Sequence, residues 1–313
     1  MGNAKATREA FGEALAQLGP THPEVVVLDA DLSKSTKTDL FAKVCPERFF
    51  EMGIQEMNMI GVAAGLALSG KVPFIASFAC FITGRFDQIK MSVGYSRARV
   101  RIVGTHAGIG IGEDGYSQQG LEDVALMRAL PEMAVIQPAD DLETRGAVEF
   151  LLTHPGPAYL RLTRQKCDRV NPEGYRFDFG KGVVLRPGRD LTIVATGAVV
   201  GGALAAASAL ARDGVDCRVV NIHTIKPLDA ELLAACARET GRILVVEDHQ
   251  ISGGLGGAVC EALCERQPVP VRRHGVLDVF GESGTPEAVY ERHGLDAAGI
   301  ARVARELLGR TRA

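Results

Sequence analysis

The sequence contains no tryptophan, and its other aromatic residues are few, with 12 phenylalanines and 5 tyrosines among 313 residues. It also lacks an excess of one charge, because 35 lysines and arginines nearly balance 38 aspartates and glutamates. No bulk field therefore recruits nucleic acid or an anionic membrane. Hydrophobic residues make up 46% and charged residues 23%, as in ordinary globular proteins, which excludes a disordered or fibrous chain.

The seven cysteines are scattered and odd in number, with no C-x-x-C pair and no zinc-type spacing. This pattern is typical of reduced thiols in a cytosolic protein and predicts no metal site. The N-terminal segment lacks the apolar core of a signal peptide. Residues 191–211 are uncharged and long enough to cross a bilayer, but their composition predicts a strand, a glycine turn and an alanine-rich helix. We therefore expect a cytoplasmic protein without a membrane span.

Short β-branched runs alternate with helical patterns along the chain, which predicts α/β domains with mostly parallel sheets and helices on both faces. The polar segment 166–190 interrupts this alternation and predicts a linker with a strand or two. We place a boundary near residue 180 and expect two doubly wound domains, 1–180 and 181–313. The strands expected in the first domain are 24–29, 72–77, 100–105, 133–137 and 158–162. Those expected in the second are 191–196, 216–221, 242–247 and 269–272.

Glu56 begins a helix, expected over 55–69, that is otherwise apolar and rich in small residues. A carboxylate at this position commonly caps the helix or interacts with its dipole. The residues that follow it are core-like, however, so the carboxyl group points into a packed or interfacial region. A carboxyl group in such a place suits proton transfer. Both interpretations remain open on local sequence alone.

Phe78 and Phe81 are three residues apart and directly follow a predicted strand. Such a pair is commonly part of the core. The alternative is a flat aromatic platform that binds a planar ring.

The loop after the strand at 100–105 contains six glycines between residues 104 and 120. It matches neither a dinucleotide-binding fingerprint nor a phosphate-binding P-loop. Its glycines allow the backbone to approach a ligand closely, and its polar residues would face that ligand. These polar residues are His106, Glu113, Asp114, Gln118 and Gln119.

Arg164 lies just past a strand end, where ligands of open α/β sheets bind. The guanidinium fork matches phosphate oxygens in a bidentate way. Arg8 and Ser35 also lie near element ends and would join such an anion site. The alternative is a solvated surface arginine.

Several stretches together resemble the C-terminal half of transketolase over nearly the whole chain. They are GIQEMNMIGVAAGLA, SFACFITGRFDQIKM, THAGIGIGEDGYSQQGLEDVALMRALP, QPADDLET, TIKPLD and VEDHQISGGLGGAV. The GEDG-x-S/T-x-Q block is specific to this family and its near relatives. The resemblance implies a pyrimidine-binding domain for thiamine diphosphate, followed by a transketolase C-terminal domain.

The resemblance also implies roles for single residues. Glu56 matches the catalytic glutamate that exchanges a proton with N1′ of the cofactor's aminopyrimidine and so activates it. Phe78 and Phe81 match residues that pack on the pyrimidine ring, and Asp31 matches an aspartate near the cofactor. Some relatives carry an aromatic residue where this chain has Gly84.

The same resemblance implies which residues bind the substrate. Residues expected to face the sugar hydroxyls are His106, which is also a catalytic candidate, Asp114 and Gln118. Many relatives carry histidine at the position of Gln118, and glutamine cannot shuttle a proton. The residues expected to bind the acceptor phosphate are Arg8, Ser35, His106 and Arg164.

The chain lacks the GDG motif and the downstream asparagine with which transketolases bind the diphosphate through Mg²⁺. The resemblance therefore implies a separate N-terminal subunit that carries this motif, an α2β2 assembly and an interfacial helix over 57–69. The expected function is ketol transfer between sugar phosphates by a split transketolase. The alternatives are a 1-deoxyxylulose-5-phosphate synthase-like enzyme, the β subunit of a 2-oxoacid dehydrogenase, and a non-catalytic scaffold subunit.

Overall fold

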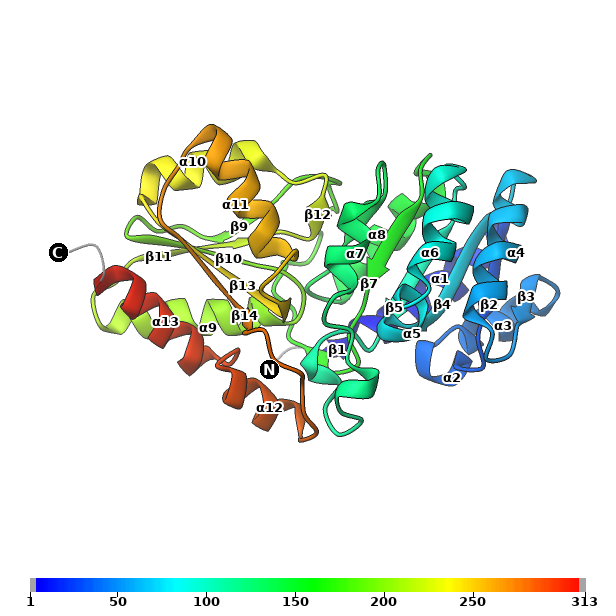
Figure 1. Cartoon of the computed structure of the whole chain (residues 1–313), viewed down its shortest axis with the longest axis horizontal. Coiled ribbons are helices and arrows are strands. Elements are labelled where there is room, and N and C mark those ends of the chain that lie inside the picture. The colour runs from blue at the N-terminus through cyan, green and yellow to red at the C-terminus, as the bar shows by residue number, and fades with distance from the viewer. Residues whose placement is uncertain (1–3, 310–313) are drawn as a thin grey trace.

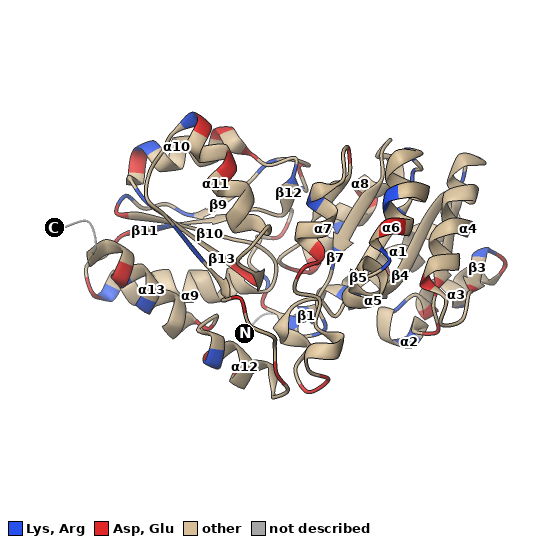
Figure 2. Cartoon of the chain, in the orientation of Figure 1, with Lys and Arg blue, Asp and Glu red and all other residues tan. Residues whose placement is uncertain are grey.

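The computed structural model describes residues 4–309 and contains two large sheets with helices on both faces of each (Figure 1). This arrangement confirms the predicted α/β class with two doubly wound domains. Basic and acidic side chains are interspersed over both domains (Figure 2). Within the described residues, no helix is long and apolar enough to cross a membrane.

The first sheet has seven strands, and all neighbouring pairs are parallel except the pair at one edge. In sheet order the strands are β12 (Thr224–Lys226), β6 (Ala134–Ile136), β7 (Ala158–Arg161), β5 (Arg101–Thr105), β4 (Val72–Phe78), β2 (Val25–Asp29) and β3 (Phe49–Glu51). Every residue of β2, β4 and β5 is buried, because helices cover both faces. Parallel strands of this kind read as continuous apolar runs, which is why the sequence predicted them.

Helices cover the two faces of the first sheet in two groups. Packed on one face are α1 (Thr7–Leu18), α3 (Asp39–Val44) and α8 (Asp141–Thr153). Packed on the other are α4 (Glu56–Leu68), α5 (Ala79–Thr83), α7 (Asp123–Ala129) and a π-helix over Ile89–Tyr95. Helix α6 (Phe86–Gln88) directly precedes this π-helix. The short helices α2 (Ser33–Thr36), α3 and α5 are absent from the prediction, because so few residues show no periodicity.

The second sheet has five strands with α9 (Val199–Arg212) and α13 (Ala297–Gly309) on one face and α10 (Ala230–Thr240) and α11 (Leu255–Arg266) on the other. In sheet order its strands are β14 (Val271–Val276), β13 (Ile243–Gln250), β10 (Leu191–Ala195), β11 (Cys217–Asn221) and β9 (Val183–Arg186). The uncharged stretch over 191–211 thus forms a buried strand and a helix, as predicted. Helix α12 (Pro286–His293) extends toward the first domain (Figure 1).

Two small ladders join distant parts of the chain. Strand β1 (Lys5–Ala6) pairs antiparallel with β8 (Lys166–Cys167), which places the start of α1 beside the segment after β7. Strand β12 follows β11 in the chain but pairs with β6 of the first sheet. The hydrophobic core accordingly continues from Met133 and Val135 to Ile222 and Ile225. The two sheets are therefore packed into one continuous interior.

Candidate active site

Glu56 is the first residue of α4, and its side chain is buried, with 5% of the residue exposed. The hydroxyl of Ser77, near the end of β4, donates a hydrogen bond to Oε1 at 3.1 Å. Within residues 4–309, no group donates a hydrogen bond to Oε2. The carboxylate therefore faces the end of β4 instead of capping its own helix, and it keeps one acceptor atom free.

The aromatic residues after β4 form a stack. The rings of Phe78 and Phe81 lie 5.5 Å apart with an angle of 10° between their planes. The centre of the His106 imidazole lies 3.8 Å from the centre of the Phe78 ring, and the two ring planes form an angle of 26°. Phe78 is buried, whereas Phe81 is half-buried, so the stack presents an aromatic surface at the carboxyl end of the sheet.

His106 directly follows β5 and adopts a left-handed backbone conformation with φ of 57°, which is rare for a non-glycine residue. Its Nε2 lies 2.8 Å from Nη1 of Arg8, and its Nδ1 lies 2.9 Å from Oγ1 of Thr105. Because a guanidinium only donates, Nε2 accepts and the proton lies on Nδ1. Burial, and then the positive charge of Arg8 and other cations, lowers the pKa of His106 to about 3. The imidazole is therefore neutral at physiological pH.

A hydrogen-bonded path connects His106 with Glu56. The Nδ1–H of His106 donates to the Thr105 hydroxyl, which in turn donates to the Ser77 carbonyl at 3.3 Å. The Ser77 hydroxyl donates to Glu56. The ends of β4 and β5 thus place the carboxylate, the aromatic stack and the imidazole in one polar arrangement.

Two arginines meet beside this arrangement. Arg8, on α1, donates to the Ser35 carbonyl at 2.8 Å, and its buried Nε has no hydrogen-bond partner among the described residues. Arg164 donates to the Ile111 carbonyl at 2.9 Å and to Oδ2 of Asp114 at 3.2 Å. The Arg164 side chain remains 38% exposed. Unsatisfied or exposed guanidinium groups of this kind are suited to binding an anion.

The structure joins the side chains of Asp31 and Gln118 to none of these groups by a hydrogen bond within residues 4–309. Asp31 follows β2, is exposed, and donates its backbone N–H to Oε1 of Glu51 at 2.7 Å. The carbonyl of Gln118 accepts from Sγ of Cys80 at 3.2 Å. Gly84 ends α5, and a Cβ there would lie 2.9 Å from the Cys80 carbonyl oxygen.

One supporting residue, Asp29, was not predicted from the sequence. Asp29, buried at the end of β2, accepts hydrogen bonds from Thr36 at 2.7 Å and Thr38 at 2.8 Å. It also accepts the backbone N–H of Leu32 at 2.7 Å. Burial raises the pKa of the Asp29 carboxyl, and these hydrogen bonds oppose the rise. Asp29 thereby shapes the loop that carries Ser35. The D-x-x-x-x-x-x-T-x-T spacing is the only sequence signal for it.

The central glycines of the glycine-rich loop pack closely against other side chains, several of them from the second domain. A Cβ at Gly108 would lie 2.1 Å from Oδ2 of Asp248, and one at Gly115 would lie 2.3 Å from Oγ of Ser283. A Cβ at Gly112 would lie 3.0 Å from Pro286. These glycines therefore permit close packing between the domains.

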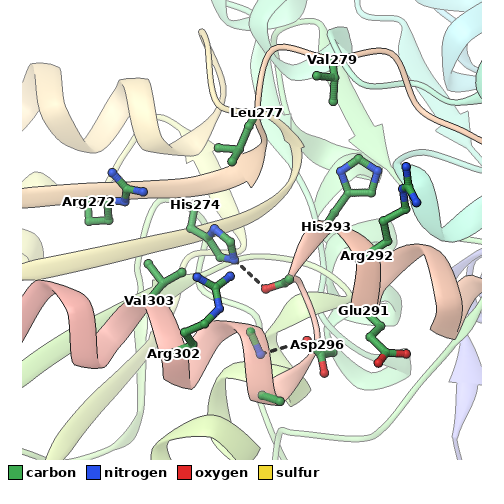
Figure 3. A pocket seen from close by; sticks show the side chains of 13 residues that line it. Arg272, His274, Leu277, Val279, Glu291, Arg292, His293, Asp296, Arg302 and Val303 are labelled. Carbon is green, nitrogen blue, oxygen red and sulfur yellow. Dashed lines mark hydrogen bonds between the residues drawn. The ribbon is translucent and has the colours of Figure 1, made fainter.

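Two cavities border the second domain. One, of about 590 Å³, lies between Arg8, Arg164 and helix α12, which contributes Pro286, Glu287 and Tyr290. The other, of about 520 Å³, lies between β14, α12 and α13 (Figure 3).

The cavity in Figure 3 contains none of the predicted site residues. Two of its arginines are already paired, since Arg292 contacts Glu282 and Arg302 contacts Glu306 at 2.8 Å. Its buried His274 is hydrogen-bonded to the Gly294 carbonyl at 2.6 Å. We therefore assign the candidate site to the first cavity and the adjoining strand ends. Within residues 4–309, no group of three His, Cys, Asp or Glu side chains is placed to hold a metal ion.

Comparisons with known proteins match both parts of the chain to one family. The transketolase pyrimidine binding domain matches residues 3–169, and the transketolase C-terminal domain matches residues 180–300. The chain is 44% identical over 302 residues to a putative transketolase C-terminal section of Methanocaldococcus jannaschii, covering 95% of each chain. It is 41% identical to the 6-deoxy-6-sulfo-D-fructose transketolase subunit SqwH of a Clostridium species, covering 97% of this chain and 94% of the relative.

A solved structure described as a split gene transketolase, inactive beta4 tetramer, superimposes with a TM-score of 0.91. It is 49% identical in sequence, and the match covers 98% of this chain and 99% of that one. The chain therefore belongs to the transketolase family and corresponds to the C-terminal subunit of a split transketolase, as the sequence motifs predicted.

Proposed function

We propose that this chain transfers a two-carbon ketol unit from a ketose phosphate to an aldose phosphate, together with a partner subunit and thiamine diphosphate. The observation that carries this proposal is the buried Glu56 carboxylate, which has one free oxygen beside the Phe78–Phe81 stack. The division into a pyrimidine-binding domain over 1–180 and a C-terminal domain over 181–313 is part of the proposal.

The residues present fit the aminopyrimidine end of thiamine diphosphate. When bound, this cofactor supplies a carbanion nucleophile and an electron sink for the transferred unit. Phe78 and Phe81 would hold the pyrimidine ring, and Asp31 is a further candidate for contact with the cofactor. Ser77 holds Oε1 of Glu56, which leaves Oε2 to exchange a proton with N1′ of the ring.

The diphosphate and Mg²⁺ belong to the partner in this proposal. Within residues 4–309, the carboxylates and histidines form no group suited to Mg²⁺. An N-terminal subunit with a GDG motif and a downstream asparagine would supply these ligands. The resulting active site is composite, which accords with the described inactivity of the related tetramer.

The sugar binds between the stack and the two arginines. His106, Asp114 and Gln118 face the hydroxyl groups of the sugar. The terminal anion is bound by Arg8, Ser35 and Arg164, and His106 takes part by accepting a hydrogen bond from Arg8 and so holding its guanidinium. The name of the Clostridium relative specifies a sulfonated sugar, and a sulfonate offers the same tetrahedral anionic oxygens as a phosphate. Both terminal groups are therefore worth testing as substrates.

Helix α4 presents the surface for assembly. Its inward face carries Glu56 and Met59, whereas Met57, Val62 and Leu68 are exposed. Large exposed apolar side chains on one helix are typical of subunit interfaces. We propose that this face takes part in an α2β2 heterotetramer in the cytoplasm.

The deciding experiment is a native purification of the tagged chain with thiamine diphosphate and Mg²⁺ present. We expect a stoichiometric second chain with the GDG motif and downstream asparagine, and ketol transfer by the complex. The Glu56→Gln chain should recover the same partner without turnover. Cofactor binding by the isolated chain would contradict the partner's role. Pyruvate consumption without a ketose requirement would favour a 1-deoxyxylulose-5-phosphate synthase-like activity.

A further inference from the structure

We propose that Tyr290, on helix α12 of the C-terminal domain, is a positioning residue that sets the affinity of the active site for the substrate's terminal anion. It acts on Arg164 through Gln165 and Asp248. The inference rests on the proposed function, because it takes Arg164 as the anion-binding residue. It assigns to the C-terminal domain a part in substrate specificity.

A short hydrogen-bonded chain carries the inference. Nε2 of Gln165 donates to the phenol oxygen of Tyr290 at 2.6 Å, and this phenol donates to Oδ2 of Asp248 at 2.7 Å. The directions are fixed, because the amide nitrogen only donates and the carboxylate only accepts. Burial and the neighbouring Asp248 raise the pKa of Tyr290 well above its usual value, so the phenol keeps its proton.

The orientation of the Gln165 amide depends on Tyr290. Its Oε1 is buried and has no hydrogen-bond partner among the described residues. The bond from Nε2 to Tyr290 is thus the one that holds this amide. The amide lies directly against Gly110, where an added Cβ would come within 2.1 Å of Nε2.

Asp248, on β13 of the second domain, binds the backbone of the glycine-rich loop. Its carboxylate accepts the backbone N–H of Ile109 at 2.8 Å and that of Gly110 at 3.3 Å. The next residue, Ile111, provides the carbonyl that accepts from Arg164 at 2.9 Å. The loop and the arginine therefore share one anchor, in which Tyr290 bridges Asp248 and the residue after Arg164.

The position of this anchor connects it to the ligand. Tyr290 lines the cavity of about 590 Å³ together with Arg8 and Arg164. Replacing the phenol by a phenyl ring leaves the Gln165 amide without its acceptor and removes one donor from Asp248. Arg164 then samples more orientations, so anion binding weakens while the distant proton-transfer groups keep their geometry.

The test compares Tyr290→Phe with wild type in the assembled enzyme, using glyceraldehyde 3-phosphate and glyceraldehyde as acceptors. We expect the KM for the phosphorylated acceptor to rise about threefold to tenfold, the effect of one hydrogen bond. The KM for the neutral acceptor and both kcat values should change less than twofold. Tyr95→Phe removes the hydroxyl of a tyrosine that is 83% exposed, and this control should behave as wild type. Equal rises for both acceptors would overturn the proposal.

A double-mutant cycle shows whether Tyr290 acts through Arg164. In the Arg164→Ala background, Tyr290→Phe should add little to the KM for the phosphorylated acceptor. Binding of inorganic phosphate, measured by calorimetry, should weaken in the same pattern without depending on turnover. If Arg164→Ala distinguishes the acceptors and Tyr290→Phe does not, the role of Tyr290 fails alone. If Arg164→Ala does not distinguish them, the proposed anion site fails and Tyr290 fails with it.

Gln165→Leu breaks the same hydrogen bond from the other end. It provides the test if Tyr290→Phe lowers the amount of folded protein. We expect it to raise the KM for the phosphorylated acceptor as Tyr290→Phe does. An unchanged ratio of the two KM values in a folded Gln165→Leu enzyme would contradict the proposal.

Discussion

The two sheets use their carboxyl strand ends in opposite ways. At the end of β4 in the first sheet, Glu56 has one bonded and one free oxygen, and the neighbouring Phe81 is half-buried. In β13 of the second sheet, both oxygens of Glu247 are bonded, to the N–H groups of Leu255 at 2.7 Å and Gly256 at 2.8 Å. The first strand end is open to a ligand, whereas the second caps the following helix, α11.

Gly254, which follows β13, shows the same difference between the two sheets. A Cβ at Gly254 would lie 2.0 Å from Oε2 of Glu247, so this glycine makes room for the protein's own carboxylate. The next residue, Asp248, binds the loop of the first domain. Carboxyl ends of parallel strands are where α/β proteins bind ligands. Here the second sheet uses its strand ends to attach the two domains to each other. The two sheets differ in whether each carboxylate oxygen at the strand end already accepts a hydrogen bond.

Substitution of Glu56 should have the largest effect, and this effect should be on activity and not on stability. Glu56→Gln keeps the bond to Ser77 within reach but removes proton exchange at Oε2. We expect turnover of the assembled enzyme to drop by about 10²–10⁴-fold, the usual contribution of general acid–base catalysis. The melting temperature should stay within a few degrees of wild type. Near-normal turnover would remove Glu56 from the proposed chemistry.

Gly108 tests the attachment between the domains. It has φ of 85°, and an added Cβ would meet the Asp248 carboxylate, so Gly108→Ala combines backbone strain with a clash. We expect a loss of about 3 kcal/mol in the free energy of unfolding, measured with denaturant. Gly70→Ala is the matched control, because its φ of 91° is equally unusual but its Cβ would meet no atom within 4 Å. Equal losses for the two variants would mean that packing at Gly108 is unimportant.

Glu247 should show the reverse of Glu56. Glu247→Ala leaves two buried backbone N–H groups at the start of α11 without an acceptor. We expect the free energy of unfolding to fall by about 2 kcal/mol. The kcat of the assembled enzyme, measured well below the melting temperature, should remain within twofold of wild type. A large loss of kcat in a stable variant would give this strand end a catalytic role and end the contrast.

The parts that the sequence predicted are those with a local signal. Buried strands such as Val25–Asp29 appear as apolar runs, and Glu56 stands out at the head of an apolar helix. Strand β12 has no such signal, since its three residues are recruited by β6 from another part of the chain. Asp248 and Tyr290 likewise have no local signal, because they bind residues of the first domain that are more than 100 positions away. Glycine-rich sequence alone does not tell whether the close neighbour is a ligand or another domain.

The smallest expected effect is a dependence of stability on pH, which comes from a buried histidine. His223 lies between the sheets, and burial alone lowers its pKa to about 4, whereas nearby cations contribute to the lowered pKa of His106. Between pH 6.5 and 4 the unfolded chain binds a proton that folded His223 does not. Its contribution to stability is therefore complete above pH 6.5 and is lost as the pH falls toward 4.

The measurement is the free energy of unfolding at pH 7 and pH 5 for wild type and His223→Asn. Asparagine places a polar group near the position of Nδ1, which is 2.9 Å from Oγ1 of Thr224, but does not titrate. We expect wild type to lose about 1–2 kcal/mol more than the variant between the two pH values. Identical losses would show that His223 is protonated without cost, and that the interior between the sheets is more polar than its burial indicates.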